Sequence, residues 1–142
     1  MLIDGKDLVL GRLASFVAKS LLEGEKVTIL NAEHVVISGR PDETLDAYKA
    51  WLDTRNVANP RRGPIHPKRP EDIVRRTVRG MLPFSKSRGM SAFRRLRVYV
   101  GVPEEFVGKE TSQVPGAGLQ DLSTKRFIRV GDLSKGLGAS FK

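Results

Sequence analysis

The segment GRLASFVAKSLLEGEKVTIL, residues 11–30, joins a helical pattern to a strand pattern. Its apolar side chains recur at the spacing of one helical face, and Gly24 is a natural end for such a helix. The residues of that face are Leu13, Phe16, Val17 and Leu21. Residues 27–30, VTIL, lack polar alternation, which is typical of a strand covered on both faces. We therefore expect a helix followed directly by a buried strand.

Helical and strand patterns continue to alternate along the rest of the chain. We expect an apolar strand at 34–38, a helix beginning at Pro41, a helix over 70–82, a short helix over 90–96, a strand over 97–103 and an edge strand over 124–130. Strands separated by helices imply a layered α/β fold with a largely parallel sheet.

The helix expected at 70–82 has two unlike faces. At about 100° per residue, its apolar and small branched side chains fall on one half of the helix surface. These side chains are Ile73, Val74, Thr77, Val78, Met81 and Leu82. We expect this half to enter the core, with Met81 among its contacts. The guanidiniums of Arg75, Arg76 and Arg79 fall on the other half, and we expect them to point outward together.

Positive charge is concentrated in the middle third of the chain, which has 142 residues and a formal net charge of +9. Residues 55–97 carry 13 Lys and Arg side chains, 11 of them Arg, against only Glu71 and Asp72. Residues 1–54 are net negative, and residues 98–142 are close to neutral. Guanidinium groups bind phosphate bidentately, and such crowding opposes compaction unless an anion lies against it. The pattern indicates a nucleic-acid surface, and its few aromatic side chains favour folded RNA over single-strand base reading.

Residues 55–70 interrupt the regular patterns with four prolines and five Arg or Lys side chains. Such a segment has too little apolar area to offset the entropy cost of ordering itself. We expect either a flexible loop or an extension that an external partner holds in place. Gly63, Gly80 and Gly89 lie in the same basic region, where a missing side chain permits close backbone approach.

Composition excludes several classes of protein. The chain has no Cys and only two histidines, His34 and His66, so we expect no disulfide, no metal site and no cofactor. No run approaches the ~20 apolar residues that span a bilayer, and Met1–Asp4 does not begin like a secretory signal. No nucleotide-binding or hydrolase motif is complete. We expect a soluble basic protein of a reducing compartment, with no membrane partner and no small-molecule substrate.

Two alternatives from other classes stay open at this level. Glu33 and His34 follow a predicted strand, where α/β enzymes often place acid–base groups, although a simple turn explains them better. A protein that binds duplex DNA is the second alternative. No helix-turn-helix or zinc-finger pattern favours it.

Several motifs in order resemble the ribosomal protein L13 family. They are Leu10–Ser15, Leu30–Glu33, Ile37–Gly39, Gly63–Pro64, Arg76–Pro83, Arg88–Gly89 and Leu96–Gly101. The short N-terminus and the sequence of Arg76–Pro83 are similar to those of family members from the archaeal and eukaryotic branch. The resemblance covers about residues 3–103, whereas residues 104–142 carry no motif that we can place.

This resemblance implies a three-layer α/β/α domain with a four-stranded, mainly parallel sheet over 1–103, which includes the basic RNA-binding segment 55–97. Residues 104–142 would form a Gly-rich, irregular C-terminal extension. The resemblance also implies a structural, non-enzymatic protein of the cytoplasmic large ribosomal subunit that binds 23S-type rRNA and helps to assemble it. Family members contact neighbouring proteins, with ribosomal protein L3 the expected one, and some bind mRNA and repress translation.

The resemblance also places the RNA-binding residues. Carried onto this chain, the basic RNA-facing region of the family falls on Arg61, Arg62, Lys68, Arg69, Arg75, Arg76, Arg79, Lys86, Arg88, Arg94 and Arg95. Arg55 extends the same basic segment, and we expect His66 to stack on a base or contact a phosphate. We expect no catalytic residue and no metal ligand.

Overall fold

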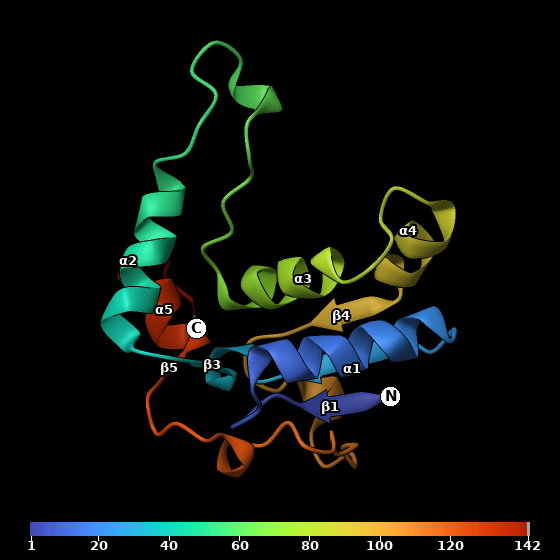
Figure 1. Ribbon diagram of the computed structural model, residues 1–142. Coiled ribbons are helices and arrows are strands. Elements are labelled where there is room, and N and C mark those ends of the chain that lie inside the picture. The colour runs from blue at the N-terminus through green and yellow to red at the C-terminus, as the bar shows by residue number, and fades with distance from the viewer. Residues whose placement is uncertain (142) are drawn as a thin grey trace.

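The computed structural model describes residues 1–141 and has a small parallel sheet at its centre (Figure 1). The sheet consists of β1 (Leu2–Asp4), β2 (Val27–Leu30) and β4 (Leu96–Val98), in the order β1-β2-β4. Ile3 pairs with Ile29 and Ile29 with Val98, so these three side chains form one buried row. The predicted buried strand at 27–30 is confirmed as the central strand.

Three helices pack against the sheet or against a helix that does so. They are α1 (Leu10–Leu22), α3 (Pro70–Gly80) and α4 (Ser87–Arg94). Helices α1 and α3 pack against each other, and Figure 1 shows α1 running along the direction of the strands, with α3 on the same side. Helix α1 buries the predicted face through Leu13, Val17 and Leu21, and α3 buries Ile73, Val74 and Val78. The helix patterns predicted for these two segments are confirmed.

The expected four-stranded sheet is wrong in its strand count. The fourth candidate, β3 (Val36–Ser38), pairs antiparallel with β5 (Phe127–Arg129) in a separate sheet. Its residue Val36 forms an isolated parallel bridge with Val9, just ahead of α1. The cause is a turn after β2, where Asn31 adopts a left-handed conformation (φ 54°) and a short 3-10 helix, η1 (Ala32–His34), redirects the chain.

The other face of the sheet is less fully covered within the described residues. Leu2, Thr28 and Arg97 pair in register on the other face of the sheet, and they remain half-buried or exposed. Strands this short bury only one face fully within residues 1–141. The architecture is therefore a mixed α/β fold with its helices packed mainly on one side of a three-stranded sheet.

The C-terminal part is more ordered than the irregular extension that we expected. Within residues 104–141, β5 forms at the predicted edge strand and α5 (Val130–Gly136) follows it directly. Val130, Leu133 and Leu137 lie at helical spacing and are buried in the same core as α1 and α3. The sequence did carry this signal, but the many neighbouring glycines made it weak.

Helix α2 (Pro41–Leu52) begins at the proline that the sequence indicated and lies beside α5 and β5. Its close approach to α5 depends on Gly136, because a Cβ atom there would lie 2.7 Å from Leu45 Cδ1. Further 3-10 turns are η2 (Pro60–Arg62), η3 (Glu104–Phe106) and η4 (Leu119–Asp121). Among residues 1–141, no helix has the length and apolar character needed to cross a bilayer.

Candidate RNA-binding surface

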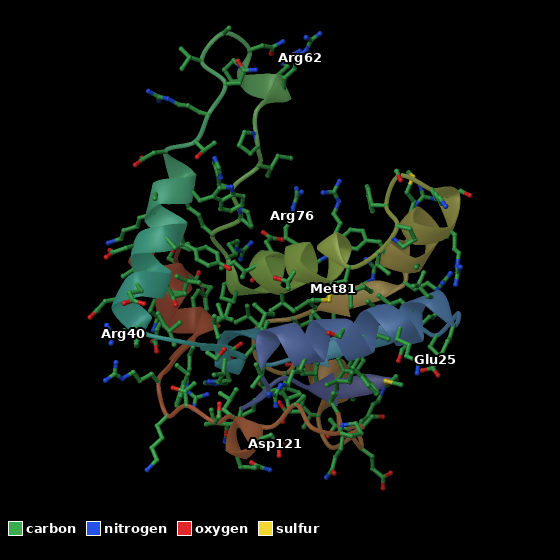
Figure 2. The ribbon with its side chains drawn as sticks, in the orientation of Figure 1. Glu25, Arg40, Arg62, Arg76, Met81 and Asp121 are labelled. Carbon is green, nitrogen blue, oxygen red and sulfur yellow. The ribbon has the colours of Figure 1, made fainter. Side chains whose placement is uncertain are left out.

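Residues 55–69 form an arm that leaves the end of α2 and returns to the start of α3. Figure 1 shows the arm projecting from the body of the protein, with η2 near its far end. Arg55, Arg61 and Arg62 on the arm are all exposed, and Figure 2 shows Arg62 near its tip. None of these three arginines makes an ion pair with another described residue. Their guanidiniums are therefore available to an external anion.

The base of the arm is fastened to the body by two hydrogen bonds. The Nε2–H of His66 donates to the carbonyl of Thr54 at 2.7 Å, and the same ring meets Trp51 edge-on at 4.5 Å between centroids. The Ser134 hydroxyl of α5 donates to the carbonyl of Lys68. His66, which we expected to contact RNA, thus has internal partners at its Nε2 atom and through its ring, whereas its Nδ1 atom is buried without a hydrogen-bond partner.

Two of the three arginines of α3 lie against aromatic rings rather than pointing freely outward. The Arg79 guanidinium lies 4.0 Å from the centroid of Phe84, and that of Arg75 lies 5.1 Å from the centroid of Phe93. The two rings contact each other edge-on, with 5.6 Å between their centroids. Our expectation of three fully outward guanidiniums is therefore wrong for Arg75 and Arg79, whose guanidiniums lie against rings. All three arginines, Arg76 included, are half-buried.

Met81 is also misplaced by the helical projection. It is 42% exposed, whereas Leu82 is buried as predicted. The projection fails because α3 ends at Gly80, so Met81 is the cap residue and no longer follows the helical phase. Instead, Met81 lies beside Arg88 and Lys19 at the edge of a shallow hollow outside the arm.

A hollow of about 360 Å³ opens between α3, the turn that follows it, and α4. Its lining consists of Ile65, Asp72, Arg75, Arg76, Arg79, Phe84 and Phe93. Ile65 comes from the arm, so arm, α3 and α4 meet here. Sequence reasoning missed this site because its members are brought together by the turn after α3 and not by any spacing along one helix.

That turn depends on a close contact at Gly89. A Cβ atom at this position would lie 2.1 Å from the carbonyl oxygen of Pro83. The missing side chain therefore permits α4 to pack on the preceding turn, which places Phe93 beside Phe84. The close approach that we anticipated at Gly89 is thus internal to the protein.

The remaining basic residues divide by exposure. Lys68, Lys86, Arg88 and Arg94 are exposed and make no ion pair among residues 1–141. The Nε of Arg69 pairs with Glu71 at 3.1 Å. The Nη2 of Arg95 donates to the carbonyl of Leu21 at 2.5 Å, which ties the end of α4 to α1. Arg95 is therefore a structural residue first.

Glu33 and His34, the candidates for acid–base chemistry, also serve the fold. The Glu33 carboxylate accepts from the backbone N–H of Gly101 at 3.0 and 3.2 Å and lies 3.5 Å from the His34 ring. The carboxylate holds the chain after β4 against η1, as a turn-stabilising residue does. No cluster of metal-ligating side chains occurs in the part of the chain that is described.

Comparison with known proteins gives a consistent family. The family model described as Ribosomal protein L13 matches residues 1–105. The large ribosomal subunit protein uL13 of Methanosphaera stadtmanae is 48% identical over 141 residues, covering 99% of this chain and 98% of the relative. The proteins of the same name from Methanococcoides burtonii and Methanocaldococcus jannaschii are each 47% identical, over 98% of both chains. Similarity to these archaeal relatives thus continues beyond residue 105.

Proposed function

The chain belongs to the ribosomal protein L13 family, and on that premise we propose that it is a structural component of the large ribosomal subunit that binds 23S-type rRNA. A role of this kind is structural and not enzymatic, in agreement with the use of Glu33 to hold a loop. The expected location is the ribosome, in the cytoplasm. Within this proposal, residues 1–103 form the L13-like part and residues 104–142 an extension, whose described residues share the same core.

One observation carries the RNA-binding part of the proposal. The arm, the turn after α3 and α4 together present at least seven Lys and Arg side chains that are exposed and have no carboxylate partner within residues 1–141: Arg55, Arg61, Arg62, Lys68, Lys86, Arg88 and Arg94. Figure 2 shows Arg76 of α3 pointing from the outer side of that helix, the side toward which the arm projects. A polyanion lying there would supply the missing countercharge.

The contacts within this surface are of two kinds. We assign direct phosphate contact to the seven exposed residues and to the α3 arginines, because phosphate contacts position a protein on nucleic acid. Arg69, Arg95 and His66 have partners inside the protein, so their contribution is to hold the arm and α4 in place. The residues of both groups belong to the RNA-binding surface predicted from the sequence.

Other partners follow from the family. We propose that neighbouring large-subunit proteins, with ribosomal protein L3 the expected one, contact faces outside the basic surface. Binding of mRNA and repression of translation would use the same guanidiniums. A surface that contacts the sugar-phosphate backbone of RNA, and not its bases, accepts more than one folded RNA. Competition between rRNA and mRNA fragments for the protein distinguishes these uses.

The first prediction is a steep salt dependence of rRNA binding. If six to ten phosphates are neutralised, the logarithm of the association constant should fall with the logarithm of salt concentration by roughly 0.7 to 0.9 per phosphate. A filter-binding or fluorescence titration of the full chain with 23S-type rRNA between low and moderate salt measures this slope. A slope near zero would contradict the proposed interface.

Competition experiments separate RNA from DNA. Matched duplex DNA should compete weakly, because a surface fitted to folded RNA does not match the B-form backbone. Equal competition by both would revive the DNA-binding alternative. Protein that fails to sediment with 50S particles would contradict the ribosomal role itself.

A further inference from the structure

We propose that the hollow between α3 and α4 is a built phosphate-binding site, in which Phe84 and Phe93 are positioning residues that hold the guanidiniums of Arg79 and Arg75. The inference rests on the proposed RNA-binding function and deepens it. Its ligand is a single phosphodiester group of bound RNA.

The first argument is the restraint on the arginines. An arginine side chain loses considerable rotamer entropy when it binds an anion, so a guanidinium that is already held binds better. In this site the restraint comes from the rings, at 4.0 Å for Arg79 over Phe84 and 5.1 Å for Arg75 over Phe93. The edge-on contact of the two rings at 5.6 Å holds the pair in turn.

The second argument is the way in which the guanidiniums are held. A ring restrains an arginine without neutralising it. A carboxylate partner would neutralise the positive charge and would also occupy the N–H donors of the guanidinium. No ion pair is formed by Arg75, Arg76 or Arg79 among the described residues. The Nε of Arg75 is buried without an acceptor, so the aromatic contact and not a hydrogen bond at that atom restrains the group.

The third argument is the balance of charge in the hollow. Its lining holds three guanidiniums and one carboxylate, that of Asp72, and is otherwise apolar. Such a donor-rich lining suits an anion. A nucleobase is a poorer fit, because stacking on Phe84 would have to compete with the guanidinium already lying 4.0 Å from the ring centroid. A base site is therefore the alternative that the experiments must exclude.

The direct test is an NMR titration of the full chain with inorganic phosphate, observed at the arginine Nε–H signals. We expect saturable shifts for Arg75, Arg76 and Arg79, and smaller shifts for Arg55 and Arg62 on the arm. Sodium chloride at matched ionic strength should not reproduce the shifts. Equal shifts at all arginines, or shifts of the Phe84 and Phe93 ring signals with uridine but not with phosphate, would overturn the assignment.

The second test substitutes the ring and leaves the charge unchanged. Phe84→Leu should weaken rRNA binding about threefold to tenfold, with little change in the salt slope, because the number of positive groups stays the same. Phe84→Trp retains an aromatic face and should restore affinity. The control is Phe106→Leu, which removes a comparable ring from beside Lys109 outside the basic segment and should leave affinity nearly unchanged.

Asp72→Asn provides a change in the opposite direction. Removing the single negative charge should tighten phosphate binding about threefold or more, since attraction to the three guanidiniums is then unopposed. If the hollow instead binds a nucleobase that donates a hydrogen bond to Asp72, Asp72→Asn should weaken RNA binding. Unchanged rRNA affinity in Phe84→Leu would refute the positioning role while leaving the proposed function intact. Absence of rRNA binding by the unaltered protein would refute that function and, with it, RNA as the ligand of this site. If Phe84→Leu fails to fold, the phosphate titration of the unaltered chain decides.

Discussion

Arg94 and Arg95 are neighbours in the chain, yet they do different work. Arg94 is exposed at the end of α4, whereas Arg95 is half-buried and donates to the carbonyl of Leu21 on α1. The Nε of Arg95 is buried without a hydrogen-bond partner, so this side chain bears a desolvation cost that only its remaining contacts offset. Of these two adjacent charges, that of Arg95 therefore serves stability, whereas that of Arg94 is exposed and belongs to the proposed RNA-binding surface.

The difference predicts opposite behaviour of two alanine variants. Arg95→Ala should lower the free energy of unfolding by about 1–3 kcal/mol, because it leaves a backbone carbonyl without its charged donor. Arg94→Ala should leave stability within about 0.5 kcal/mol and weaken rRNA binding only. Urea denaturation of both variants measures the first effect, and salt-matched binding measures the second. Equal stability of the two proteins would show that the contact between Arg95 and Leu21 contributes nothing.

At the scale of elements, the arm differs from the helices on either side of it. Its residues 55–62 are exposed, and Val57 on the arm is 77% exposed, so little apolar area holds it in one conformation. The segment of the arm that returns to α3 is held by two hydrogen bonds. One joins His66 to the carbonyl of Thr54, and the other joins the carbonyl of Lys68 to the hydroxyl of Ser134. The far end and the base of the arm should therefore differ in local stability.

Limited proteolysis should reveal this difference. In the free protein, trypsin should cut first after Arg55, Arg61 or Arg62, because cleavage needs local opening and the tip has few contacts to lose. In assembled ribonucleoprotein the same bonds should be protected by RNA. Mass spectrometry of early fragments identifies the cuts. Equal protection in both states would mean that packing within the protein, and not RNA, holds the arm.

At the scale of the whole molecule, one core joins the two ends of the chain. Ile128, Val130, Leu133 and Leu137 are buried together with Leu13 and Val17 of α1, and β5 supplies the partner of β3. The C-terminal residues are therefore part of the folding unit, although the family model itself ends at residue 105.

Deletion of residues 127–142 should accordingly unfold the protein. Each of the four buried side chains contributes about 1.5–3 kcal/mol through removal from water, and the sum is comparable to the entire stability of about 5–15 kcal/mol typical of a domain. Loss of amide dispersion in the NMR spectrum and of a cooperative thermal transition would show unfolding. A truncated chain that melts cooperatively near the temperature of the full chain would show that 1–126 forms a sufficient core.

The amino-acid sequence by itself determined the helices at α1, α2 and α3, the central strand β2 and the basic character of residues 55–97. These features are local, because they depend on the periodicity of neighbouring apolar residues and on the count of charges. The family was equally readable, since its motifs lie in order along the chain.

Only the tertiary structure decided how many strands pair, which arginines have partners within residues 1–141 and which side chains line the hollow between α3 and α4. Strand pairing joins residues about 90 positions apart, such as Ile37 and Ile128, and no short-range pattern encodes that choice. The hollow likewise depends on a turn that brings Phe84 and Phe93 under α3, so Arg75 and Arg79 look like ordinary surface charges until the chain folds. Contacts between segments that are distant in sequence are set by the packing of the whole core, and that packing separates arginines with partners inside the protein from the exposed arginines that we propose as RNA contacts.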